Sequence, residues 1–283
     1  MAKPLERRSA KLLAFFLALI MIGSALAIAL RGANTTPKRE VKLSFDDFTA
    51  VTNLPDTPSE IYYFNFRVND TNLLNLIQAY AKLVMRDPVF RYVKLTGFDS
   101  AAFAYYPKTN SYVYLFNTSS KIFASYDRKM KVGEFDVKVK DFYAFCDQVN
   151  PALIGTSDVV FNYLENVGKE KENLLKYVPE KNYAFFRAFQ GEIVKQLIRL
   201  NDSNITVADF YFEGYALNGS KYEKVVAMNF TSNTFFVEES NVTEEYYVFE
   251  KGTLSVAVLI DSNFTKLLEA QPEMRSVIIK MEE

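Results

Sequence analysis

The chain has 283 residues, of which 49% are hydrophobic and 24% are charged, and its formal net charge is −1. This composition supplies a packed core and excludes a disordered stalk, and the near-neutral charge excludes a nucleic-acid-binding protein with a basic stripe. Histidine is absent and Cys146 is the only cysteine, which excludes Ser-His-Asp and Cys-His catalysis, most zinc sites and an intrachain disulfide.

The first element in chain order is an apolar run without charged residues at 12–30. A helix of that length spans most of a bilayer's hydrocarbon core, so the run predicts a transmembrane signal anchor. A cleaved signal peptide is the alternative, because Ala25-Leu26-Ala27 resembles a cleavage site. With the anchor, residues 1–11 form a cytoplasmic tail and residues 31–53 a stalk.

Asn-x-Ser/Thr sequons without proline follow the apolar run throughout the chain. The candidate glycosylation sites are Asn34, Asn69, Asn117, Asn201, Asn204, Asn218, Asn229, Asn241 and Asn263. Because N-glycans are added outside the cytoplasm, we expect a single-pass protein of the cell membrane with an extracellular, glycosylated body.

The first part of that body, residues 54–176, is expected to be one structural unit. Its apolar strand at 61–68 is followed by an amphipathic helix that Asp70 or Thr71 caps and that ends before Pro88. We expect an antiparallel meander from strands at 92–97, 101–106, 111–117, 121–126 and 134–139, then a helix at 142–149, a strand at 152–155 and a helix at 157–167.

The remaining residues, 177–283, show the same order of patterns. We expect a strand at 183–189, a helix at 191–200, strands at 209–217, 222–231, 234–237, 245–249 and 253–260, a helix at 263–270 and a strand at 276–280. The spacing of apolar residues after Gly133 recurs after Gly252, which indicates an internal repeat. The predicted fold class is α+β, an N-terminal transmembrane helix followed by two tandem repeats of a strand-helix-antiparallel-meander-helix unit.

No pattern in the sequence indicates a catalytic residue, a cofactor site or a metal site. The 18 tyrosines and 25 phenylalanines are interpreted as packing between layers, with an aromatic groove for sugar, lipid or peptide as the alternative. Asp46-Asp47 and the other acidic clusters lack the spacing of a calcium loop, so we expect them to be solvated. Cys146 is expected to be a small buried residue, with an intermolecular disulfide as the alternative.

The function that these features favour is a non-catalytic binding or structural role at the cell surface. One alternative is a tethered carrier of lipid or another small ligand in an aromatic pocket between the repeats, and another is a hydrolase that uses carboxylates without histidine. The expected partners are membrane lipid at residues 12–30 and a protein at a glycan-free face around residues 140–200. This face is inferred because no sequon begins between Asn117 and Asn201.

Overall fold

The computed structural model of the chain describes residues 40–167, 169, 173–198, 207–231 and 233–276. The expected tail and anchor at residues 1–30 lie outside this part of the chain. None of the helices formed by the described residues is long and apolar enough to cross a membrane. The expectation of a single-pass transmembrane protein with a signal anchor is corrected accordingly, because no described helix provides such a span.

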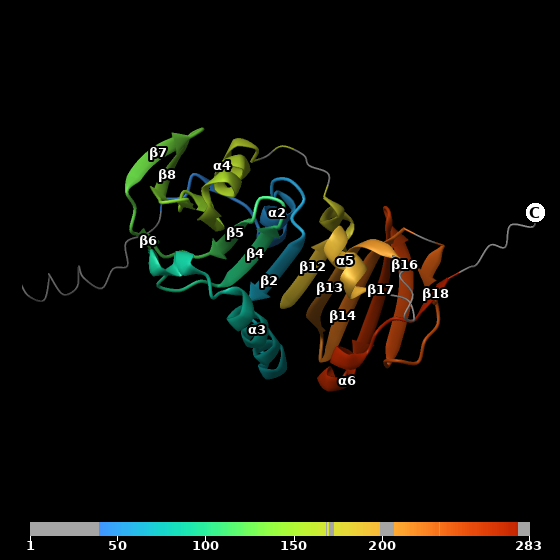
Figure 1. The fold of residues 1–283 in the computed structure, drawn as a ribbon. Coiled ribbons are helices and arrows are strands. Elements are labelled where there is room, and N and C mark those ends of the chain that lie inside the picture. Colours follow the sequence, from blue (N-terminus) through green and yellow to red (C-terminus); the bar gives the residue numbers. More distant parts are fainter. Residues whose placement is uncertain (1–39, 168, 170–172, 199–206, 232, 277–283) are drawn as a thin grey trace, which may run out of the picture. The chain divides into compact units, whose positions relative to one another are not determined.

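The described residues form one compact unit around a 12-stranded sheet in which every neighbouring pair is antiparallel (Figure 1). From one edge to the other the strands are β16 (Glu245–Lys251), β17 (Leu254–Asp261), β14 (Lys221–Phe230), β13 (Ala208–Asn218), β12 (Phe185–Gln190), β2 (Glu60–Asn65), β4 (Ser100–Tyr106), β5 (Ser111–Asn117), β11 (Ala152–Thr156), β9 (Tyr143–Cys146), β8 (Phe135–Lys140) and β7 (Arg128–Val132).

The predicted fold class is therefore wrong, because one sheet runs through both of the units that were expected as tandem repeats. The opening strands of those units, β2 and β12, pair with each other in antiparallel register, with Phe64 opposite Phe185. Both strands carry buried apolar side chains on their two faces. Such strands are unfavourable as open edges, and pairing them also satisfies their backbone groups. The domain boundaries expected from the sequence stay a prediction.

Short elements lie around the large sheet. The described helices are α2 (Asp47–Thr52), α3 (Thr71–Val84), η1 (Pro88–Arg91), α4 (Ser157–Glu165), η2 (Leu174–Tyr177), α5 (Glu192–Leu197) and α6 (Phe264–Glu269). Three two-stranded sheets pair β1 (Leu43–Ser44) with β10 (Val149–Asn150), β3 (Val93–Lys94) with β6 (Phe123–Ala124), and β15 (Thr234–Phe236) with β18 (Met274–Ser276).

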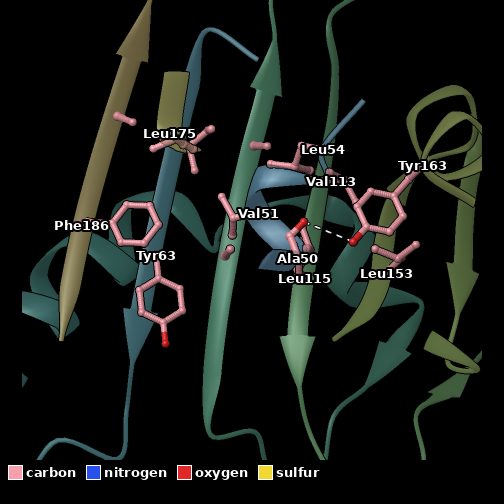
Figure 2. Close-up of a cluster of buried hydrophobic side chains, with 14 of the residues drawn as sticks. Ala50, Val51, Leu54, Tyr63, Val113, Leu115, Leu153, Tyr163, Leu175 and Phe186 are labelled. Carbon is pink, nitrogen blue, oxygen red and sulfur yellow. Dashed lines mark hydrogen bonds between the residues drawn. The ribbon is translucent and has the colours of Figure 1, made fainter. Parts of the chain in front are cut away.

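The two faces of the sheet are covered by different helices. On one face, which we call the α2 face, apolar side chains of α2, α4 and η2 pack on the strands, and the Tyr163 hydroxyl donates a hydrogen bond to the Ala50 carbonyl at 3.2 Å (Figure 2). The opposite face, the α3 face, is covered by α3, α5 and α6. Because side chains alternate along a strand, neighbours such as Phe186 and Arg187 of β12 project to opposite faces.

Several local predictions can be compared with these elements. Asp70 caps α3 as expected, since its carboxylate accepts the Leu73 amide at 2.9 Å. Cys146 is buried, which confirms that expectation. The helix expected at 142–149 is wrong, because these residues form β9 and β10. Tyr143 and Phe145 fill one face of β9 while Ala144 fills the other, and this alternating burial between two neighbouring strands favours a strand over a helix.

Candidate ligand-binding cleft

The candidate site is built around Asp47, the first residue of helix α2. The preceding residue, Asp46, caps this helix by accepting the Thr49 amide at 2.8 Å. The cap fixes where the short helix begins on the α2 face and so fixes the position of Asp47. Ala50 and Val51 hold the helix down through their burial in the core of that face.

The Asp47 carboxylate accepts hydrogen bonds from three neutral donors on three adjacent strands. Its Oδ2 accepts the Tyr63 hydroxyl of β2 at 2.9 Å and the Ser100 hydroxyl of β4 at 2.5 Å. Its Oδ1 accepts the Asn117 amide of β5 at 2.8 Å. Ser100 and Asn117 face each other across the β4–β5 pair, so the sheet register itself brings these donors together.

These hydrogen bonds orient the carboxylate without neutralising it. A carboxylate has about four acceptor positions, so the three bonds leave one on Oδ1. Among the described residues, none of the ion pairs within 4.0 Å includes Asp47, and the nearby Arg67 is paired with Asp99. The pKa of Tyr63 is raised well above its usual value, first by burial and second by the nearby charge of Asp47. The hydroxyl therefore keeps its proton and remains a donor.

Two adjoining cavities meet at this carboxylate. Their volumes are about 520 and 470 Å³, and they share Asp47, Tyr63, Asn117 and Asn182. We call the combined space the Asp47 cleft. Each cavity lies within the range of about 300–1,000 Å³ that is typical of small-molecule sites.

One wall of the cleft is aromatic. The rings of Tyr63 and Phe186 stack at 5.0 Å with an interplanar angle of 21°, and they lie on neighbouring strands in Figure 2. Phe48 and Tyr183 meet Phe186 edge to face at 6.2 and 5.8 Å. Since Tyr63 belongs to β2 and Phe186 to β12, this wall lies where the two halves of the sheet join.

The charged groups that line the cleft leave an excess of negative charge. Two cations in the described part of the chain line the cleft, and both are already paired: Lys181 with Glu223 and Arg67 with Asp99. Asp46 and Asp47 line the cleft without such a partner. Burial alone raises the pKa of Asp46, but hydrogen bonds from Thr49 lower it by more, so its net pKa is below the usual value and it is ionised at neutral pH.

The expected glycosylation sites are scattered, and only two of those in the described part of the chain line the cleft. Asn69 is exposed at its margin, whereas the Asn117 side chain points inward and its Nδ2, the atom that would carry a glycan, donates to Asp47. A glycan on this atom would extend into the cleft beside Asp47. Asn218 donates to Glu223 and Asn229 to Asp209.

The last two described sites, Asn241 and Asn263, are both exposed, and Asn263 caps α6. Asn34, Asn201 and Asn204 lie outside the described residues. Glycosylation of the sites stays a prediction, as does a partner near residues 140–200, a stretch that contributes both buried strands and exposed helix surface. Across the described residues there is no group of three or more cysteines and carboxylates placed to hold a metal ion.

Sequence patterns alone did not single out this cleft. Asp47 lies 16, 53 and 70 positions from its three donors, so no local motif joins them, and the expected solvated carboxylate is instead half-buried. A weak signal exists, because Ser100 begins β4 and Asn117 ends β5, and the central residues of both strands are apolar. Polar residues at the ends of apolar strands therefore marked the site, although nothing in the sequence showed that they meet.

The described residues thus form a single large antiparallel sheet with a polar cleft on one of its faces. Residues 44–168 match the AF_2048_N family N-terminal domain. A relative from Archaeoglobus fulgidus, described as an uncharacterized protein, is 34% identical over 298 residues, which cover 97% of this chain and 95% of the relative. The chain belongs to this family, and its matched domain includes Asp47 and all three of its donors.

Similar solved structures are crystal forms IV, III and I of TP0453. Their TM-scores are 0.41, 0.40 and 0.39, and their sequence identities are 8%, 8% and 10%. The matches cover 80%, 79% and 80% of this chain and 100%, 98% and 96% of those chains. At these scores the likeness supports no conclusion about the present chain.

Proposed function

We propose that the protein is a non-catalytic binding protein whose Asp47 cleft takes a small organic cation, such as an ammonium or guanidinium group with apolar substituents. The observation that carries this proposal is the state of Asp47, which is half-buried, held by three neutral donors and free of an ion-pair partner within 4.0 Å among the described residues.

A carboxylate in this setting attracts a cation more strongly than an exposed one does. The attraction between opposite charges grows as water is excluded, and Asp47 is partly shielded from water. Because Tyr63, Ser100 and Asn117 already fix its orientation, binding costs little rearrangement. The remaining acceptor position on Oδ1 suits the N–H group of a ligand.

The partly exposed ring of Phe48 suits the same class of ligand, whereas Tyr63, Tyr183 and Phe186 are at most 8% exposed. The faces of aromatic rings carry partial negative charge, so they attract cations and also pack against the apolar substituents of an amine. The carboxylates that line the cleft make it a poor site for a lipid anion. This places a carrier of small cations ahead of a lipid carrier.

The titratable groups of the cleft favour binding over catalysis. A general acid or base works best with a pKa near the operating pH. The pKa of Asp46 is lowered and that of Tyr63 is raised, so both groups are shifted away from neutrality. Neither Asp46 nor Tyr63 is therefore tuned to act as a general acid or base at neutral pH.

Calorimetric titration with matched ligand pairs tests the proposal. The cations choline and methylguanidine are compared with the uncharged analogues of similar shape, 3,3-dimethylbutan-1-ol and methylurea. We expect at least one cation to bind, its neutral analogue to bind more weakly, and Asp47→Asn to weaken the cation by about tenfold or more, since hydrogen bonds to charged groups contribute about 1.5–3 kcal/mol. Asp136→Asn, at an exposed carboxylate outside the cleft, is the matched control and should bind as the wild type does.

Two results would overturn the proposal. One is equal affinity for the charged and neutral members of each pair, or no binding by any of them. The other is an equal loss of affinity in Asp47→Asn and Asp136→Asn, which would locate binding elsewhere.

A further inference from the structure

The large sheet ends at two strands, β7 and β16, and the edge of β16 has an unusual surface for an open strand. Tyr247 and Phe249 are 42% and 37% exposed, and their rings stack at 6.4 Å with an interplanar angle of 19°. Among the described strands, β16 pairs only with β17. An open strand edge with exposed aromatic side chains is a template for pairing with another strand.

The sequence of β16 is complementary to itself when two copies run antiparallel about Val248. In that register Glu245 lies opposite Lys251, and Tyr247 lies opposite Phe249. These four residues are spaced two apart along the strand, so their side chains share one face, and Val248 projects from the other. Along the interface between the two strands, the cross-strand pairs are therefore Glu245 with Lys251, Tyr247 with Phe249, and then the same two pairs in reverse order.

We propose that two copies of this chain associate through β16 in this register, so that their sheets continue across a two-fold axis at Val248. Each cross-strand aromatic or opposite-charge pair stabilises such a joint, and two-fold symmetry makes every contact occur twice. A register with the axis at Tyr247 is worse, because it would place Glu250 opposite Glu244.

The opposite edge of the sheet shows what a protected edge looks like in this protein. Arg128, Lys129 and Lys131 are all exposed on β7. Because every charge on this strand has the same sign, two copies of β7 repel each other, and basic edge strands are a known protection against edge-to-edge association. The contrast explains why β16, and not β7, is assigned as the joint.

Cysteine cross-linking in the full chain tests the register. The Cα atoms of paired residues lie about 4.5–5.5 Å apart, within the range that a disulfide can bridge. Val248→Cys should therefore form a covalent dimer under mild oxidation. Tyr246→Cys should not, because in this register the two copies of residue 246 are separated by about four residues along the strand, or about 13 Å. Met130→Cys, on the exposed edge strand β7, is the matched control, and the native Cys146 is buried.

Sedimentation of unmodified chains tests the contacts. Phe249→Glu should weaken the dimer by about tenfold or more, since it removes both aromatic pairs. Lys251→Glu should weaken it less, because its partner across the joint, Glu245, is also paired with Lys221 within the chain at 2.7 Å. A wild-type chain that is monomeric at every concentration, equal cross-linking by Val248→Cys and Met130→Cys, or a dimer that Phe249→Glu leaves unchanged would overturn the proposal.

Discussion

Two carboxylates on opposite faces of the sheet, Asp47 and Glu213, are held in similar ways but end in different states. Each accepts a tyrosine hydroxyl from the sheet, Tyr63 to Asp47 at 2.9 Å and Tyr215 to Glu213 at 2.7 Å. The other donors to Asp47 are neutral, whereas those to Glu213 are cations. This difference decides whether the negative charge remains available.

Both carboxylate oxygens of Glu213 are bound by side chains of the protein itself. It is 2% exposed, and its Oε2 accepts Nε of Arg187 at 2.6 Å while its Oε1 accepts Nζ of Lys224 at 2.9 Å. Lys224 is 0% exposed and also donates to the Ala270 carbonyl at 2.7 Å. The guanidinium of Arg187 lies over the ring of Tyr80 at 5.5 Å.

One strand contributes side chains to both the Glu213 cluster and the Asp47 cleft. On β12, Arg187 projects to the α3 face and pairs with Glu213, while its neighbour Phe186 projects to the α2 face and forms the wall of the Asp47 cleft. A buried carboxylate with two cations has no charge left for a ligand. A half-buried one held by neutral donors has no such cation beside it.

The largest expected effect comes from removing the charge of Glu213. Glu213→Gln leaves Lys224 and Arg187 as neighbouring cations without their shared carboxylate, and breaking a buried ion pair in this way costs about 3–5 kcal/mol. Urea unfolding should show this loss in the free energy of unfolding, and Asp47→Asn should lose much less. If the two substitutions were equally destabilising, the comparison between the two carboxylates would fail.

Acid should remove the stabilising charge of Glu213. Burial raises the pKa of Glu213, but the charges of Lys224 and Arg187 outweigh burial, so its net pKa is lowered from 4.5. A carboxyl group with a lower pKa in the folded state contributes stability at higher pH and loses it as the pH falls through that folded-state pKa.

The free energy of unfolding of the wild type should therefore fall as the pH drops below about 4.5. Measuring this energy in Glu213→Gln at the same pH values provides the control, and its slope should be shallower. Parallel slopes in the two proteins would mean that other groups cause the acid sensitivity.

The features of the fold that could be predicted from the sequence are local ones. The Asp70 cap and the alternation of Phe135, Val137 and Val139 in β8 were readable because neighbours along the chain determine them. The pairing of β2 with β12 was not, because two apolar strands far apart in sequence carry no information about which strand each will join. For the same reason, Asp47 could not be matched to its donors, which lie 16, 53 and 70 positions away.

A smaller effect is expected from the hydroxyl of Tyr63. Tyr63→Phe keeps the aromatic wall and removes one hydrogen bond to Asp47, which should cost about 0.5–1.5 kcal/mol of stability. Two other donors, Ser100 and Asn117, remain in place. Thermal unfolding measures the change, with Tyr105→Phe as the control because, among the described residues, its hydroxyl bonds only to Asn110 in an exposed turn. A loss as large as that of Glu213→Gln would contradict the view that neutral donors only orient Asp47.

The smallest effect on stability, and the sharpest test of charge in the cleft, is expected from Arg67. Its side chain is 70% exposed and paired with Asp99 at the surface, and such exposed pairs add little to stability because water screens them. Arg67→Gln should therefore unfold at nearly the wild-type temperature. It also removes a positive charge from the lining of the cleft, so a bound choline should gain affinity while the neutral 3,3-dimethylbutan-1-ol should not. A variant that bound both probes unchanged would show that the charge near Asp47 does not select the ligand, because repulsion by Arg67 and attraction by Asp47 act on the same cation.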